Sequence, residues 1–234
     1  MVRHGQASYM SEDYDRLSTI GEEQAIKLGE FWVRHEIQFD ACFQGPAQRH
    51  ARTAEIAADV VKAAGLPWPE AEIIEDVDEF DAFRLARLLG PRLVEVDPGI
   101  RKLNDDFIAN RHTPEGGRSL QKLFEAVARM WSSGQYDSPD FESWSHFRGR
   151  VQRAVERIRQ TCAGGRNVVV ITSGGPIAAT VAQALDLDPL AAIEFVWLAR
   201  NCSFAEFLFS GDRFSMHSFN SIPHLDDRRL LTYR

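Results

Sequence analysis

The sequence has few cysteines and no residue pattern typical of a metal site. Its 234 residues include Cys42, Cys162 and Cys202, an odd number without paired spacing. A disulfide framework or a cysteine-based metal site is therefore excluded, and we expect three small buried hydrophobic side chains. Histidines and carboxylates at metal-ligand spacing are also lacking, so the sequence predicts neither a bound metal nor another cofactor.

Long apolar runs, repeats and an excess of basic residues are lacking as well. No stretch approaches the roughly 18 apolar residues of a membrane helix, and the first residues contain no apolar core of a signal peptide, which predicts a cytoplasmic protein. The formal net charge of −7 disfavours nucleic acid and anionic membranes as partners, so any anion site must be built locally. Without repeats or long linkers, residues 1–234 are interpreted as a single domain.

Strand and helix patterns alternate along the chain. Helices are predicted over 22–36, 47–64 and 176–185, and strands over 40–44, 167–172, 193–198, 203–209 and 213–219. Residues 144–159 also have helical spacing, and their arginines are expected to cover the polar faces. This order predicts an α/β fold, a three-layer α/β/α sandwich with a mostly parallel central sheet and an antiparallel edge.

The segment from about 80 to 140 matches no pattern of the rest of the chain. It contains four prolines and a Gly116-Gly117 pair, with helical stretches near 82–89 and 119–132. Insertions of this kind on an α/β scaffold often cover an active site. We therefore interpret this segment as a variable insertion or cap.

Two clusters of polar residues have the composition of an anion site with a nucleophile. Arg3-His4-Gly5 stands where a first strand would end, and a neutral imidazole next to a guanidinium can attack a phosphorus atom whose oxygens the arginine holds. Arg49 begins a helix directly after a strand, where the helix dipole also favours an anion. Taken alone, the first cluster is equally compatible with a surface loop and an incidental histidine.

The order of these motifs resembles the histidine phosphatase superfamily, which has the phosphoglycerate mutase-like fold. Its first motif is Arg-His-Gly, and its second motif, Ser-Pro-Leu-x-Arg-Ala-x-x-Thr-Ala, matches Arg49, Thr53 and Ala54 in register. The stretch 15–25 resembles Asp-x-Leu-Thr-x-x-Gly-x-x-Gln-Ala, and 77–79 resembles the segment that supplies the family's proton donor. The likeness resumes at 168–175 and near 201–203, leaving only about 82–140 unmatched.

This resemblance implies hydrolysis of phosphomonoesters through a phosphohistidine. His4 would attack the phosphoryl group while Arg3 and Arg49 hold its oxygens, with the other ring nitrogen of His4 bound to a backbone carbonyl. Glu79 is the candidate acid for the leaving group. Asp78, Asp81 and Glu75 are its rivals in the same acidic stretch. The expected partner is a small phosphorylated substrate or inorganic phosphate.

The chain departs from the family where a second histidine should follow the later strand. Ser173 stands at that position, followed by Gly174, so a hydroxyl and a helix N-terminal amide would replace a cation on the phosphate. Two alternatives follow, a weakened phosphatase or a module that binds phosphorylated ligands without turnover. Residues 6–10 lack the Trp-Asn pair of the mutases, which disfavours phosphoglycerate mutase activity.

Two further features concern the first strand and assembly. Only Met1 and Val2 precede Arg3, so we expect a short central strand and a less stable sheet. The aromatic residues of 195–197 and 204–209 are candidates for an interface, with a homodimer as one option.

Overall fold

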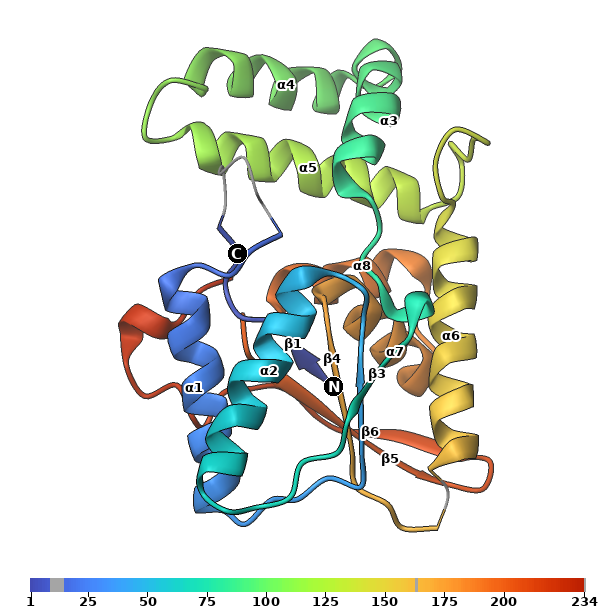
Figure 1. Cartoon of the computed structure of the whole chain (residues 1–234). Coiled ribbons are helices and arrows are strands. Elements are labelled where there is room, and N and C mark those ends of the chain that lie inside the picture. Colours follow the sequence, from blue (N-terminus) through green and yellow to red (C-terminus); the bar gives the residue numbers. More distant parts are fainter. Residues whose placement is uncertain (9–14, 163, 234) are drawn as a thin grey trace.

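The fold is known from a computed structural model that describes residues 1–8, 15–162 and 164–233 (Figure 1). Tyr9 and Met10, which belong to the stretch 6–10 compared above, lie outside the described residues. The strands are β1 (Val2–Arg3), β2 (Ala41–Gln44), β3 (Ala71–Ile73), β4 (Val168–Thr172), β5 (Phe204–Ser210) and β6 (Arg213–Ser221). The helices are α1 (Thr19–Arg34), α2 (Gln48–Ala63), α3 (Ala82–Val96), α4 (Pro98–Asn110), α5 (Gly116–Ser132), α6 (Trp144–Thr161), α7 (Gly174–Leu185) and α8 (Pro189–Leu198).

The six strands form one mixed sheet in the order β3-β2-β4-β1-β5-β6. The strands β3, β2, β4 and β1 are parallel, whereas β5 and β6 form an antiparallel edge. In the parallel register Arg3 of β1 lies beside Thr172 of β4. The predicted α/β sandwich with a mostly parallel sheet is therefore confirmed.

Helices cover both faces of this sheet, because β4 is apolar on both sides as buried parallel strands are. Val169 and Ile171 pack with α1 and α2 on one face, and Val170 packs with α6 on the other. Figure 1 shows α1 and α2 on one side of the sheet and α6, α7 and α8 on the other. Because β1, β2 and β4 are parallel, their carboxyl ends meet at one edge of the sheet, between the two helical layers.

The segment 80–140 folds into α3, α4 and α5, which lie together beyond one end of the sheet (Figure 1). Leu89 of α3 and Trp131 of α5 belong to the same buried apolar cluster as Trp144 and Phe147 of α6. The ring centroids of Trp131 and Trp144 are 5.2 Å apart. The cluster therefore continues from the sandwich into this segment. We propose that the chain is one domain in which this segment forms a variable cap.

The structure corrects one predicted strand and adds two elements. Residues 193–198 are not a strand but the end of helix α8, whose N-cap Asp188 accepts a hydrogen bond from the amide of Ala191 at 2.9 Å. Five apolar residues with the single charged residue Glu194 among them have no period that separates a strand from a helix, and the Asp188-Pro189 start signal decides for the helix. The helix α4 and the short edge strand β3 were not predicted.

The first strand is short, as expected. Only Val2 and Arg3 pair with β4, and an apolar cavity of about 510 Å³ lies beside Met1 and Val2, between β4 and the β5–β6 hairpin. The cavity opens at the end of β1 opposite to His4. None of the predicted site residues lines it.

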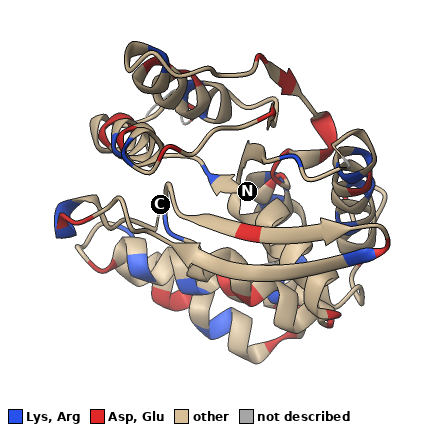
Figure 2. Cartoon of the chain, turned by 90° about the horizontal axis from the view of Figure 1, so that it is seen from below, with Lys and Arg blue, Asp and Glu red and all other residues tan. Residues whose placement is uncertain are grey.

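The described residues contain no helix that is long and apolar enough to cross a membrane. Within the same residues, no group of three or more His, Cys, Asp or Glu side chains is placed to hold a metal ion. The three cysteines are free and buried. In Figure 2 basic and acidic residues are interspersed along the helices.

We predict that Leu89→Ala lowers the free energy of unfolding by about 2–5 kcal/mol, because Leu89 is fully buried where α3 packs on α5 and α6. Val96→Ala at the exposed end of the same helix is the matched control, with an expected change within about 0.5 kcal/mol. Urea denaturation followed by tryptophan fluorescence and circular dichroism measures both. Two separate transitions would contradict a single cooperative domain.

Candidate functional site

His4 follows β1 directly and is held by the sheet and by its own turn. Its amide donates to the carbonyl of Thr172 at 2.9 Å, and its Nδ1 lies 2.7 Å from the carbonyl oxygen of Gly5. A carbonyl oxygen can only accept, so Nδ1 carries the ring proton and Nε2 keeps its lone pair. Burial lowers the pKa of His4 well below its usual value, and the positive charges of Arg49 and Arg3 lower it further. The imidazole is therefore neutral, as a nucleophile requires.

Arg49 reaches His4 from the first turn of α2. Its Nε donates to His4 Nε2 at 3.2 Å, and its Nη2 lies 3.4 Å from Ser173 Oγ. Its Nη1 pairs with Asp15 Oδ1 at 2.5 Å, while Asp15 Oδ2 accepts the amide of Gln48 at 2.8 Å. A carboxylate thus occupies the positive N-terminus of α2, next to the guanidinium that was predicted to bind phosphate.

Arg3 and the start of α7 border the same space. Arg3 Nη1 donates to the carbonyl oxygen of Ala199, which follows α8. A Cβ atom on Gly174 would lie 3.8 Å from Arg3 Nε, so the first turn of α7 lies against the guanidinium. Ser173 is buried at the N-cap of α7, but its side chain makes no capping hydrogen bond there and turns toward α2. The four predicted phosphate-binding residues are therefore brought together.

Glu79 approaches the site from the other side of α7. Its Oε2 accepts the amide of Gly175 at 3.1 Å and its Oε1 accepts the amide of Phe80 at 3.1 Å. A Cβ atom on Gly175 would collide with Glu79 Oε1, so the glycine admits the carboxyl group. Desolvation raises the pKa of Glu79, and the two amides together with the charges of Arg49 and Arg3 only partly oppose it.

The rivals of Glu79 have other contacts. Asp81 caps α3 by accepting the amide of Arg84 at 2.9 Å, and Asp78 accepts the amide of Glu79 at 2.8 Å. Glu75 is exposed. Among the four candidates, Glu79 is the one whose carboxyl group contacts α7.

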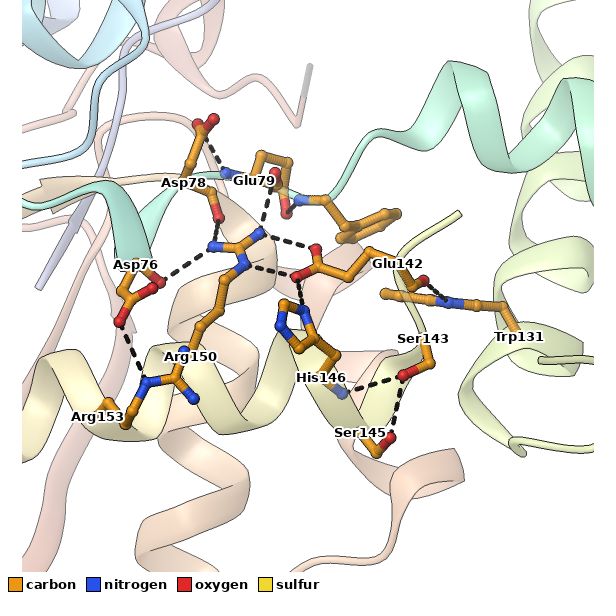
Figure 3. Close-up of polar contacts among 11 residues, drawn as sticks. Asp76, Asp78, Glu79, Trp131, Glu142, Ser143, Ser145, His146, Arg150 and Arg153 are labelled. Carbon is orange, nitrogen blue, oxygen red and sulfur yellow. Dashed lines mark hydrogen bonds and ion pairs between the residues drawn. The ribbon is translucent and has the colours of Figure 1, made fainter. Parts of the chain in front are cut away.

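Arg150 of α6 holds the backbone that carries Glu79 (Figure 3). Its guanidinium donates to the carbonyl oxygens of Asp76 at 3.0 Å, Asp78 at 2.8 Å and Glu79 at 3.3 Å. Both oxygens of Glu142 accept its remaining N–H groups, at 2.8 and 3.1 Å. A guanidinium supplies five donors in a rigid fork, which suits several fixed acceptors. The side chain is only 11% exposed, so Arg150 does not cover a polar face as was expected of this arginine run.

Three residues of this site were missed at the sequence level. His50 is fully buried, with Nε2 2.7 Å from Ser173 Oγ and its ring centroid 5.5 Å from that of His4. The sequence feature that could have identified His50 is its position directly after Arg49. Arg150 lies three residues after Phe147 and four before Ala154, on the apolar stripe of its helix, which is a readable signal. Asp15 had been quoted in a motif without a role.

We predict that Arg150→Met lets the 76–79 backbone move, so that water reaches the carboxyl group and the pKa of Glu79 falls toward its ordinary value. The free energy of unfolding should fall by about 1–3 kcal/mol, because buried carbonyl groups lose their donor. Arg153→Met is the matched control on the same helix, since Arg153 is 61% exposed and pairs with the Asp76 carboxylate at 3.5 Å. Carbon-13 NMR titration of Glu79 measures the effect; an unchanged titration in Arg150→Met would contradict it.

Comparisons with known proteins show which solved structures the fold is similar to. The fold is similar to phosphoglycerate mutase from Bacillus anthracis, with 18% identity, a TM-score of 0.64 and coverage of 96% of this chain and 92% of the other. It is also similar to a mycobacterial glucosyl-3-phosphoglycerate phosphatase in complex with inorganic phosphate, with 20% identity, a TM-score of 0.60 and coverage of 96% and 97%. The fold is similar as well to phosphoserine phosphatase from Entamoeba histolytica in complex with 3-phosphoglyceric acid, with 18% identity, a TM-score of 0.57 and coverage of 96% of each chain.

A comparison with curated protein sequences gives no match. The family model of the histidine phosphatase superfamily (branch 1) matches residues 1–123 and 82–222, which together span nearly the whole chain. The resemblance in the motifs, the fold and the family model lead to one conclusion: the chain belongs to the histidine phosphatase superfamily.

Proposed function

We propose that this protein hydrolyses phosphomonoesters through a phosphohistidine formed on His4. The observation that carries the proposal is the state of His4, a neutral imidazole whose Nδ1 proton is bound by Gly5 and whose Nε2 lone pair lies 3.2 Å from the Nε of Arg49. A nucleophile oriented in this way beside a guanidinium can attack phosphorus while the cation binds its oxygens.

In the first step, His4 Nε2 attacks phosphorus and the bond from phosphorus to the ester oxygen breaks. The leaving oxygen takes the proton of Glu79, whose raised pKa keeps the acid form available. In the second step, Glu79, now a carboxylate, takes a proton from water as the water oxygen attacks phosphorus. The bond from phosphorus to Nε2 breaks, which releases phosphate and restores both side chains.

The phosphoryl oxygens would be held by Arg3, Arg49, the hydroxyl of Ser173 and the amide of Gly174. These groups border one space at the N-termini of α2 and α7, where helix dipoles favour an anion. An incoming phosphate would compete with Asp15 for Arg49, because the carboxylate occupies the same guanidinium. No metal or other cofactor enters this reaction. The expected substrate is a small phosphorylated molecule, whose identity would depend on the α3–α5 segment above the site.

The second candidate function is a module that binds phosphorylated ligands without turning them over. The residue that favours it is Ser173, because a hydroxyl supplies one hydrogen bond and no positive charge where the family has a histidine. Losing one donor to transition-state charge costs about 10²–10³ in turnover, so the serine by itself predicts a slow enzyme. Turnover by the purified protein decides between the two candidates.

We predict that His4→Ala abolishes hydrolysis of p-nitrophenyl phosphate, because no other imidazole has a lone pair oriented like that of His4. Rapid denaturation without acid during turnover should leave phosphate covalently bound to the wild-type protein. Acid treatment should then release that phosphate. Inorganic phosphate should still raise the melting temperature of His4→Ala, since the arginines remain. Full activity of this variant would exclude the proposed mechanism, and phosphate binding without any wild-type turnover would favour the binding module.

We also predict a pH profile set by Glu79 rather than by His4. Glu79 has a raised pKa in the folded protein, so its acid form is present at low pH and is lost as the pH rises through that pKa. Turnover of an alkyl phosphate, a poor leaving group, should therefore fall with rising pH. The pKa of His4 is lowered, so its protonation should cause no loss of activity near pH 6.5.

The matching variant is Glu79→Gln. It should lower kcat/KM, which reports the steps up to formation of the phosphohistidine, by about 10²–10⁴-fold for alkyl phosphates and much less for aryl phosphates, whose leaving groups need no acid. Stopped assays across pH 5–8 measure both series. An equal loss for both substrate classes would show that Glu79 is not the proton donor.

A further inference from the structure

His50 and its hydrogen bond to Ser173 have no role in the mechanism above. His50 is fully buried in the first turn of α2, and its Nε2 lies 2.7 Å from Ser173 Oγ at the start of α7. The two residues are 123 positions apart in the sequence. A buried hydrogen bond this short joins the N-termini of the two helices that border the phosphate space.

Gly45 makes room for this histidine. A Cβ atom on Gly45 would collide with His50 Nδ1 and would lie 2.9 Å from its Cε1, so any other residue at 45 would displace the ring. The second family motif quoted above has serine at position 45 and alanine at 50, and the family's later signature has histidine at 173. These three departures of the chain meet at one point, where Gly45 leaves space for the His50 ring and His50 bonds Ser173.

The hydrogen bonds at Ser173 Oγ determine where its proton can point. A hydroxyl group has two acceptor lone pairs and one donor. Arg49 Nη2, which can only donate, approaches Oγ at 3.4 Å. If His50 Nε2 also donates, both lone pairs are used and the hydroxyl proton is left for a third group, the phosphoryl oxygen. If Ser173 donated to His50 instead, it would present a lone pair to that anionic oxygen, which is repulsive.

We propose that His50 is a positioning residue that donates its Nε2 proton to Ser173 and thereby directs the Ser173 hydroxyl proton at the phosphoryl oxygen. The inference rests on the proposed function of this site. It assigns the task of the missing second histidine to two residues, a buried imidazole from α2 and a hydroxyl from α7. The imidazole orients the contact, and the hydroxyl makes it.

The state of His50 agrees with this assignment. Burial first, and then the charge of Arg49, lower its pKa to about 3, so the ring is neutral and carries one proton. The backbone of Gly45 lies beside Nδ1 and favours a proton on the ring, but Nδ1 forms no hydrogen bond of normal geometry within the described part of the chain. The acceptor within hydrogen-bond distance of the ring is Ser173 Oγ, 2.7 Å from Nε2.

Four variants test the proposal by activity. His50→Leu removes the donor and fills the space, His50→Gln keeps an N–H near the position of Nε2, and Ser173→Ala removes the hydroxyl. Ser173→Ala should lower kcat by about 10²-fold. His50→Leu should lower it by a similar factor, and the double variant no further, because the two residues act in series. His50→Gln should recover most of the activity, with KM little changed throughout.

The matched control is His224→Leu, because His224 is also buried but stacks on Phe204 with ring centroids 6.0 Å apart, outside the site. It should leave kcat unchanged, which separates a positioning effect from the cost of losing a buried histidine. Wild-type kcat in His50→Leu, or additive losses in the double variant, would overturn the proposal. So would failure of His50→Gln to recover activity while its melting temperature matches the wild type.

A second measurement does not depend on turnover. Nitrogen-15 NMR of histidine-labelled protein, titrated with inorganic phosphate, should show the Nε2–H form of His50, with a shift on phosphate binding that is lost in Ser173→Ala. An Nδ1–H form in the phosphate complex would overturn the proposal. If no ester is hydrolysed but this shift is present, the proposed function is wrong and the pairing of His50 with Ser173 stands.

Discussion

The site depends on the parallel pairing of β1 with β4. This pairing places Arg3 beside Thr172, and the amide of His4 extends it by bonding the carbonyl of Thr172 at 2.9 Å. Both strands end at the same edge of the sheet. The residues that follow them, His4 after β1 and Ser173 after β4, therefore lie side by side. From α2, Arg49 contacts both residues and His50 contacts Ser173, while Glu79 contacts the amide of Gly175, two residues after Ser173. Two short backbone segments thus set the position of the proposed nucleophile relative to the helix proposed to bind the anion.

The second constraint is the balance of charge among the desolvated side chains of the site. Desolvation and the nearby guanidinium of Arg49 disfavour cations on His4 and His50, so both rings are neutral and their hydrogen bonds determine what each nitrogen can do. The same desolvation raises the pKa of Glu79 and keeps a proton available. The burial that lowers the pKa of the histidines is therefore also what makes the carboxyl group an acid. Arg150 contributes by holding the backbone of Glu79 at this depth.

Much of the fold could be predicted because its patterns are local. The β-branched run at 168–172 and the helical spacing at 47–64 each report on their own neighbourhood, and both elements are present near the predicted bounds. The strand expected at 193–198 was wrong because apolar residues lie on every face of α8, the exposed Leu190 and Leu198 included, so its sequence has no period that distinguishes a helix from a strand. The helix α4 was missed although Asp97-Pro98 is a start signal like that of α8.

The sequence by itself determined the family, the α/β sandwich, and the candidates His4, Arg3, Arg49, Glu79, Ser173 and Gly174, because motifs in a fixed order identify them without any contact being known. Their roles remain proposals. Only the tertiary structure decided which acid among four reaches α7, that Arg150 turns inward, and that His50 bonds Ser173. These are relations between residues 71 to 123 positions apart. No local pattern encodes such a distance in space, because it follows from how the sheet aligns its strands and how the helices pack across it.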